Sequence, residues 1–470
     1  MGAVAQRQEA NDLGSLQCGF ESHRPHWPGR RPRRLPAGGA AIIVVAVTLA
    51  AAAIAACAAA PPARQVPRFA VSPLQGLADG SFVLRATGLR PGAIVTVQAS
   101  AVDATGLSWI SSASYRADHT GAFSTSSAAA VQGSYGGVDP AGLLWSMRPA
   151  NGTDPRLAFF VPSAGGWTVT LRIVTGHRQV AEASVRRLMQ APGVTSVPLP
   201  RRSTGFTGRY FAPPGNARRP AVLVFDGSDP GMQVPLDIAS LLASHGIPAL
   251  ALCYFGCPGL PSDLDRIPLE YFMTAVRWLA RRQGVNGRLV WLLGISRGSE
   301  AALLLGADYP ALVHGVIALV PSNVVNEALR NFYQPVADSA WTLRGRPVPF
   351  TKQFGTPAPT DNPAAIIPVQ RIAGPILLIA AQDDRLWPSP AYSNAIMARL
   401  ARFRRPFPRQ LLDLPGAGHD MSETVPNLPA GTSVPYRGGV YSLGGTRAAN
   451  QAAKVRAWQA ILSFINAHSS

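Results

Sequence analysis

From residue 206 to the C-terminus, short apolar runs alternate with segments of helical periodicity. A short continuous apolar run indicates a strand buried on both faces, and an apolar period of about 3.6 residues indicates an amphipathic helix. The predicted strands span 221–225, 247–252, 289–293, 315–320, 375–381 and 410–414. The predicted helices span 236–243, 269–282, 300–306, 391–401 and 447–467. Because strands and helices alternate, we predict a mainly parallel, doubly wound sheet in an α/β domain over 206–470.

Residues 69–190 have a different, all-β texture. The clearest alternation of apolar with polar or small residues is at Trp167, Val169, Leu171 and Ile173. Turns containing glycine or proline separate such runs, and this pattern predicts a small antiparallel sandwich. We predict a linker over 61–68 before the sandwich and a connector over 191–205 after it. The sandwich contains no plausible catalytic set of side chains.

The N-terminal region has the features of an export signal. Residues 1–39 are a basic, proline-rich leader, and residues 40–60 carry no charge over about the length that crosses a hydrocarbon core. Because the arginines precede this run, the positive-inside tendency places the rest of the chain outside the cytoplasm. Cys57 resembles the lipid-modified cysteine of bacterial lipoproteins; a cleaved signal sequence and an uncleaved transmembrane segment are the alternatives. We expect a protein of the cell envelope, tethered to the outer face of the cytoplasmic membrane by lipidated Cys57 or by the uncleaved segment.

Charge and cysteine content exclude some classes of function. The formal net charge is +18, but the arginines are scattered and form no run of five or more basic residues. Nucleic acid is therefore not an expected partner, whereas a membrane surface or an acidic substrate fits. Of the four cysteines, Cys253 and Cys257 form an even pair beyond the leader, either as a short disulfide or as two free thiols. No Cys/His spacing predicts a metal site, and we expect neither metal nor cofactor.

A nucleophile is predicted at Ser296. Residues 294–298 read Gly-Ile-Ser-Arg-Gly and match the G-x-S-x-G nucleophile elbow. The five-residue pattern is weak by itself, but here a predicted strand ends at Leu293 and a predicted helix follows Gly298. That context is the strand-to-helix turn that lifts a serine hydroxyl above the edge of a sheet.

The serine needs a general base and an acid that orients it. Of the eight histidines, only His314, His419 and His468 follow Ser296. His314 precedes a strand and His468 lies in the terminal tail, whereas His419 follows the carboxyl end of a strand, where catalytic groups collect in α/β sheets. The acid is predicted just after the strand 375–381, where the residues alone leave Asp383 and Asp384 open, and the other aspartate is expected to cap the next segment. The order Ser, Asp, His is that of the α/β hydrolases.

An oxyanion hole requires backbone N–H groups that point at the developing negative charge. One is predicted from Arg297, directly after the nucleophile. Another is predicted from the loop 226–231 after the first buried strand, at Gly227 or Ser228. The same loop also reads as a simple tight turn, and both readings can hold together.

Several motifs outside the elbow resemble a known family, the acyl-CoA thioesterases grouped with bile acid-CoA:amino acid N-acyltransferases. The resemblance covers residues 66–466 and is carried by GSYGGVDP at 133–140, GLLWSM at 142–147, LEYF at 269–272, LLGIS at 292–296, QDD at 382–384 and PGAGH at 415–419. It implies an N-terminal immunoglobulin-like sandwich that shapes the cleft of an α/β-hydrolase domain. It also implies a triad of Ser296, Asp384 and His419.

The resemblance implies cleavage of a fatty acyl thioester to the free acid through an acyl-Ser296 intermediate. The conjugating members of the family carry cysteine at the elbow, so serine favours hydrolysis. Export is a departure, because the relatives work inside cells where acyl-CoA is found. An exported carboxylesterase or an acyltransferase acting on envelope lipids is therefore an alternative. A non-catalytic envelope lipoprotein that binds a partner through the sandwich is an alternative of another class.

Overall fold

The computed structural model describes residues 66–331, 333–423, 425–436 and 438–469. The predictions for the leader, the segment 40–60 and Cys57 lie outside these residues. Within the described part of the chain, no helix is both long and apolar enough to cross a membrane.

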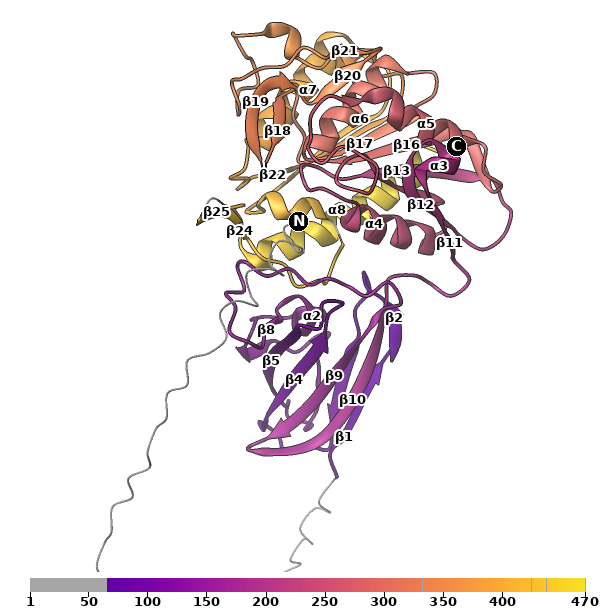
Figure 1. Ribbon diagram of the computed structural model, residues 1–470. Coiled ribbons are helices and arrows are strands. Elements are labelled where there is room, and N and C mark those ends of the chain that lie inside the picture. The colour runs from indigo at the N-terminus through magenta and orange to yellow at the C-terminus, as the bar shows by residue number, and fades with distance from the viewer. Residues whose placement is uncertain (1–65, 332, 424, 437, 470) are drawn as a thin grey trace, which may run out of the picture.

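The N-terminal part is a β-sandwich that lies against one side of an α/β domain (Figure 1). One sheet has the order β1 (Arg68–Ser72), β3 (Val83–Thr87), β6 (Phe123–Ser124). The other has the order β2 (Gln75–Leu77), β10 (Arg178–Leu188), β9 (Trp167–Thr175), β4 (Ile94–Val102), β5 (Ser108–Arg116), β7 (Ala130–Gly133), and β8 (Arg148–Pro149) also pairs with β5. The alternation seen in the sequence gives β9 one apolar face, which packs against the other sheet. Val169, Leu171 and Ile173 on this face are fully buried.

The second domain is built on an eight-stranded sheet. Its order is β11 (Thr195–Leu199), β12 (Thr207–Ala212), β14 (Ala249–Cys253), β13 (Arg219–Phe225), β16 (Val285–Ile295), β17 (Gly315–Leu319), β22 (Ile376–Ala381), β23 (Arg409–Leu414). The six strands from β14 to β23 pair in parallel, whereas β11 and β12 are antiparallel at one edge. The predicted fold class, an α/β hydrolase sheet preceded by a small all-β sandwich, is confirmed. The segment 191–205, predicted as a connector, contains β11 and the short helix α3 (Arg201–Thr204).

Helices cover both faces of this sheet. The helices are α4 (Gln233–Ser244), α5 (Leu269–Ala280), α6 (Arg297–Asp308), α7 (Ser389–Arg402) and α8 (Arg447–Ala467). On β13, Val222 and Val224 join the core that includes α4, α8 and the sandwich, and Leu223 and Phe225 join the core that includes α5, α6 and α7. Since α4 and α8 share one core with the sandwich, the two domains are packed together through these helices.

Both domains also contain short helices and strands that the sequence pattern did not predict. They are α2 (Gly142–Trp145) in the N-terminal domain, and β15 (Ile267–Pro268), β18 (Glu327–Arg330), β19 (Gln334–Ser339), β20 (Trp341–Leu343), β21 (Arg346–Pro347), β24 (Ser433–Tyr436) and β25 (Gly439–Ser442) in the α/β domain. Strands this short carry no sustained period, so sequence periodicity does not detect them. Those between β17 and β22 form a cap over α5 and α6 (Figure 1).

Candidate active site

Ser296 lies at a sharp turn between β16 and α6. Its φ of 51° is in the left-handed region, and its backbone N–H donates to the Leu319 carbonyl at 2.9 Å. The glycines on either side are needed for close approach, because a Cβ at Gly294 would collide with the Gly298 carbonyl and one at Gly298 with the Asp226 carbonyl. The strained turn therefore places the predicted nucleophile at the carboxyl edge of the sheet.

His419 and Asp384 complete a line of hydrogen bonds with Ser296. The Nε2 atom of His419 is 3.0 Å from Ser296 Oγ, and its Nδ1 atom is 2.9 Å from Asp384 Oδ2. The Asp384 side chain has no exposed surface and that of His419 is 8% exposed. Asp384 is held by N–H donors from Leu386 and Trp387, at 3.0 and 3.2 Å. The three residues thus have the geometry in which a histidine can accept the serine proton.

Asp383 turns away from this line. Its carboxylate contacts Arg385 Nε at 3.0 Å and accepts the Gly445 N–H at 2.8 Å, and these two contacts hold its pKa below the usual range. The expectation that the second aspartate would cap the following segment therefore does not describe Asp383. Asp384 accepts the N–H groups of that segment in addition to contacting His419, because its carboxylate has lone pairs for both.

The three backbone N–H groups predicted to form the oxyanion hole differ in whether they already donate a hydrogen bond. A Cβ added to Gly227 would be 2.8 Å from Ser296 Cβ, so this loop passes directly over the nucleophile. The Gly227 N–H, however, donates to the carboxylate of Asp226 at 2.7 Å. The N–H groups of Ser228 and Arg297 donate no hydrogen bond within the described part of the chain. The latter two are therefore available to an incoming oxygen, and Gly227 is already occupied.

A buried acid, Asp226, begins this loop. Burial, together with the charge of Asp229, raises the pKa of Asp226 to about 7. Tyr254 donates to the carbonyls of Asp226, at 3.0 Å, and Gly227. Tyr254 itself lies between Cys253 and Cys257, which are joined by a disulfide. The disulfide-closed turn thus packs against the loop over the nucleophile, and sequence reasoning did not find this role for Asp226 or Tyr254.

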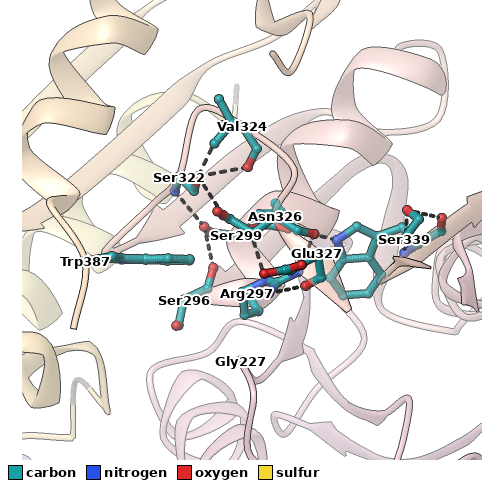
Figure 2. A network of polar contacts seen from close by, with 12 residues as sticks. Gly227, Ser296, Arg297, Ser299, Ser322, Val324, Asn326, Glu327, Ser339 and Trp387 are labelled. Atoms are coloured by element: carbon teal, nitrogen blue, oxygen red, sulfur yellow. Dashed lines mark hydrogen bonds and ion pairs between the residues drawn. The ribbon is translucent and has the colours of Figure 1, made fainter. Parts of the chain in front are cut away.

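A polar cluster buried behind Ser296 consists of Arg297, Glu300, Asn326 and Trp341; we call it the serine-side cluster. Figure 2 shows Arg297 and Asn326 of this cluster beside Ser296. The Arg297 and Glu300 side chains are 3% and 0% exposed and form an ion pair at 3.0 Å. Glu300 also accepts from Asn326 Nδ2 at 2.7 Å and from Trp341 Nε1 at 3.0 Å. Burial raises the pKa of Glu300, and Arg297 opposes that shift.

The Arg297 guanidinium also reaches the backbone of the segment that follows β17. It donates to the carbonyl oxygens of Asn326 and Glu327, both at 2.9 Å. The first turn of α6 is therefore joined to residues 326–327 of the cap by charge-assisted hydrogen bonds. A charged pair at i and i+3 inside an otherwise apolar helix was the sequence signal for this cluster.

A second polar cluster lies behind His419 and consists of Asp420, Arg447, Asn450 and Lys454; we call it the histidine-side cluster. Lys454 Nζ is 3.0 Å from Asp420 Oδ2, and the two side chains are 3% and 1% exposed. Asn450 Oδ1 accepts the Gly418 N–H at 2.8 Å. Both residues come from α8, so this helix holds the loop on each side of His419.

Arg447 connects the histidine-side cluster to the sandwich. It donates to the carbonyl oxygens of Trp145, at 2.9 Å, and Met147. Burial lowers the pKa of Arg447, and Asp420 opposes that shift. A cavity of about 10 Å³ lies between Trp145 and the cluster, which is about the smallest space that holds one water molecule. A lysine at 454 on the buried face of a predicted helix was the signal that sequence reasoning passed over.

Trp387 borders His419 and was also missed. The two rings are 5.9 Å apart with an angle of 74° between their planes, and Trp387 Nε1 donates to the Val320 carbonyl at 3.1 Å. Among the residues the structure describes, no group of three or more His, Cys, Asp or Glu side chains could hold a metal ion.

Comparison with known proteins places the chain in a family. The N-terminal region of the acyl-CoA thioester hydrolase/BAAT family matches residues 79–201, and the C-terminal region of that family matches residues 267–470. A peroxisomal succinyl-coenzyme A thioesterase of Mus musculus is 30% identical over 408 residues, which is 83% of this chain and 94% of the relative. An acyl-coenzyme A thioesterase 1 of Homo sapiens is 30% identical over 401 residues, which is 81% of this chain and 91% of the relative.

Among solved structures, a dienelactone hydrolase-like promiscuous phosphotriesterase from metagenomic libraries is similar to this chain with a TM-score of 0.38 and 17% identity. The match covers 59% of this chain and 100% of that one. The two family regions and the relatives that span most of the chain agree with the resemblance inferred from the motifs. The chain belongs to the acyl-CoA thioester hydrolase/BAAT family.

Proposed function

We propose that this protein is an acyl-CoA thioesterase that uses Ser296, His419 and Asp384 as a catalytic triad. The observation that carries the proposal is the continuous line of hydrogen bonds from Ser296 through His419 to Asp384 in a member of this family. The names of the relatives supply the substrate class, an acyl thioester of coenzyme A.

The reaction proceeds in two stages. Ser296 Oγ attacks the thioester carbonyl while His419 Nε2 takes the hydroxyl proton, and Asp384 stabilises the resulting imidazolium. The Ser228 and Arg297 N–H groups donate to the oxyanion. The tetrahedral intermediate collapses, the carbon–sulfur bond breaks, and His419 gives the proton to the leaving thiolate sulfur. A water molecule then attacks the acyl-Ser296 ester while His419 takes its proton, and His419 passes that proton to Ser296 Oγ as the ester bond breaks and the carboxylic acid is released.

The same triad could also cleave an oxygen ester, whose leaving group is an alcohol and not coenzyme A. The export signal predicted at 40–60 would place the protein in the cell envelope, where little coenzyme A is expected. A carboxylesterase or an acyltransferase acting on envelope lipids is therefore the second candidate. A membrane tether through Cys57 or through the segment 40–60 belongs to this proposal as well. Lipidation of Cys57 is tested by asking whether globomycin blocks cleavage of the signal sequence and whether Cys57→Ser abolishes it.

The deciding experiment compares the full chain with Ser296→Ala. Both proteins are assayed against acyl-CoAs of several chain lengths and against p-nitrophenyl esters of matched length. We expect acyl-CoA hydrolysis to fall by at least about 10³-fold in the variant. Hydrolysis of oxygen esters alone would reject the thioesterase and leave the second candidate. Failure of Ser296 to react with a fluorophosphonate probe would favour a non-catalytic binding protein.

A further inference from the structure

A second cavity lies in the α/β domain, apart from the triad. It has a volume of about 500 Å³ and is bounded by the end of α6, the turn between β20 and β21, the segment 363–371 and Arg399 of α7. None of Ser296, Asp384 and His419 lines it. These elements lie on the side of the domain away from the sandwich (Figure 1). The cavity is therefore a separate site that takes no part in the proposed hydrolysis.

The floor of this cavity is apolar. Leu304, Val325, Val348 and Ile367 line it and are each at most 9% exposed. Four prolines line its walls as well, namely Pro347, Pro349, Pro363 and Pro368. Cavities of about 300–1,000 Å³ with such a lining are typical of sites for small molecules. The floor has the chemistry to hold a hydrocarbon chain.

Three arginines and a single acid line the rim. Arg346 makes no side-chain hydrogen bond or ion pair within the described residues, and Arg371 Nη1 is 3.9 Å from Asp308 Oδ1. Arg399 Nε donates to the neutral side chain of Gln370 at 2.5 Å. Two of the three guanidinium charges, those of Arg346 and Arg399, are therefore not balanced by an acid.

The surroundings of Arg399 disfavour its positive charge. Burial lowers the pKa of Arg399, and the like charges of Arg402 and Arg371 lower it further. An anion at the rim would relieve the repulsion, and a guanidinium can bind a carboxylate or a phosphate with two hydrogen bonds.

We propose that this cavity binds an anionic amphiphile, with its hydrocarbon chain on the apolar floor and its carboxylate or phosphate head group held by Arg346 and Arg399. The inference does not depend on the thioesterase proposal, although that reaction would release such a carboxylate. A free fatty acid and an anionic phospholipid share this chemistry, and direct binding distinguishes the two sources.

The test is a calorimetric titration of the full chain with dodecanoate and with monomeric dihexanoylphosphatidylglycerol. We expect at least one of them to bind, and the one that binds identifies the source of the anion. Dodecanol should bind at least about tenfold more weakly than dodecanoate, because it lacks the charge-assisted hydrogen bonds. Binding of neither anion would overturn the proposal, as would equal binding of dodecanol and dodecanoate.

Variants locate the site. Arg346→Glu changes an exposed side chain and should weaken binding of the anion by at least about tenfold, and Arg399→Ala should do the same. Ala364→Trp, at an exposed position in the lining, should block the cavity. Arg288→Ala, at an exposed arginine outside the lining, is the matched control and should bind normally. Binding that survives in both Arg346→Glu and Ala364→Trp would place the ligand elsewhere, including at the triad, and would reject the proposal.

Because binding heat does not require turnover, the result is independent of the Ser296→Ala assay. An inactive triad with an intact cavity would still bind the amphiphile. A thermal melt of each variant, compared with the unmodified chain, separates loss of the site from loss of the fold. Arg346→Glu is the decisive variant if Arg399→Ala unfolds, since Arg399 is half-buried and Arg346 is not.

Discussion

The two polar clusters behind the proposed triad differ in the part of the molecule that assembles them. The serine-side cluster is built from α6, the segment after β17 and β20, all within the α/β domain. The histidine-side cluster is built from the His419 loop and α8, and its Arg447 donates to carbonyls of the sandwich. Each contains a buried ion pair, at 3.0 Å in both cases.

The difference indicates that the proposed nucleophile and the proposed base are positioned by different means. Ser296 is held by a local turn and by a network inside one domain. His419 is held by a loop whose supports reach the sandwich, so the sandwich contributes to the placement of His419 without supplying a side chain to the proposed triad. Substitutions in and around the two clusters test this contrast.

The largest expected effect is in the serine-side cluster. Glu300→Ala leaves Arg297 as an unpaired buried charge and removes the acceptor of Asn326 and Trp341. Breaking a buried pair in this way should lower the free energy of unfolding by about 3–5 kcal/mol. Chemical denaturation measures it, and Glu300→Gln should lose less because the amide still accepts a hydrogen bond. A loss below about 1 kcal/mol for Glu300→Ala would show that the cluster does not support the fold.

The next effect is in the histidine-side cluster and concerns activity. Lys454→Met leaves Asp420 unpaired beside His419, and the loop should shift to solvate this charge. Misplacement of a catalytic group by about 1 Å can cost about 10²-fold, so we expect kcat to fall by about 10- to 100-fold. Steady-state kinetics check this, with KM changing less than kcat.

A second substitution controls for the charge. In Lys454→Met/Asp420→Leu both charges are removed, and kcat should recover part of the loss. If the double variant is as slow as the single one, the ion pair does not position His419. A normal kcat in Lys454→Met would remove the distinction between the two clusters.

A smaller effect concerns pH and the loop over Ser296. The pKa of Asp226 is raised to about 7, so its carboxyl becomes charged near neutral pH, close to where the oxyanion forms. The ratio of kcat/KM at pH 8.5 to kcat/KM at pH 6 should therefore be about 3- to 10-fold higher in Asp226→Asn than in the unmodified chain. This change corresponds to an electrostatic interaction on the order of 1 kcal/mol. The contribution of Asp226 to the free energy of unfolding should also fall as pH rises from about 4 to about 7, since the fold opposes this ionisation. An Asn variant with the same pH profiles as the unmodified chain would exclude both effects.

The smallest effect is at the contact between the sandwich and α4. His245 Nε2 is 2.5 Å from Asp79 Oδ2, and this contact raises the pKa of His245 although burial opposes it. A raised histidine pKa stabilises the fold below about pH 6.5, and the contribution is lost as pH rises through the folded-state pKa. His245→Gln should thus cost about 0.5–1 kcal/mol at pH 5.5 and less at pH 8.5, since the side chain is partly exposed. Thermal melts at the two pH values measure it, and an equal loss at both would exclude a charged His245.

Sequence periodicity predicted most strands of the eight-stranded sheet. The helix predicted over 447–467 is α8 with the same bounds, and the predicted parallel strands lie within a few residues of those observed. The antiparallel edge formed by β11 and β12 was not predicted, nor were β18 to β21. These strands are short and several contain proline, such as Pro198 and Pro335, so they lack the alternation that reveals a longer strand.

The sequence by itself determined the family, the parallel part of the sheet and the candidates for the proposed triad. The elbow is a local pattern, and the order of Ser296, an aspartate and His419 along the chain can be read without coordinates. The residues alone left Asp383 and Asp384 open, because neighbouring side chains on a loop have no fixed direction. The resemblance to the family favoured Asp384, and the structure places that carboxylate, not its neighbour's, at His419.

Only the tertiary structure decided what supports the proposed triad. Trp341 is 41 residues from Glu300, and Lys454 reaches Asp420 only because α8 packs across the sheet. The second cavity likewise depends on α6, α7 and the cap coming together, and its arginines are scattered in the sequence. Short-range patterns report local conformation, whereas buried charge pairs and cavities arise where distant segments pack, so no window of sequence could show them.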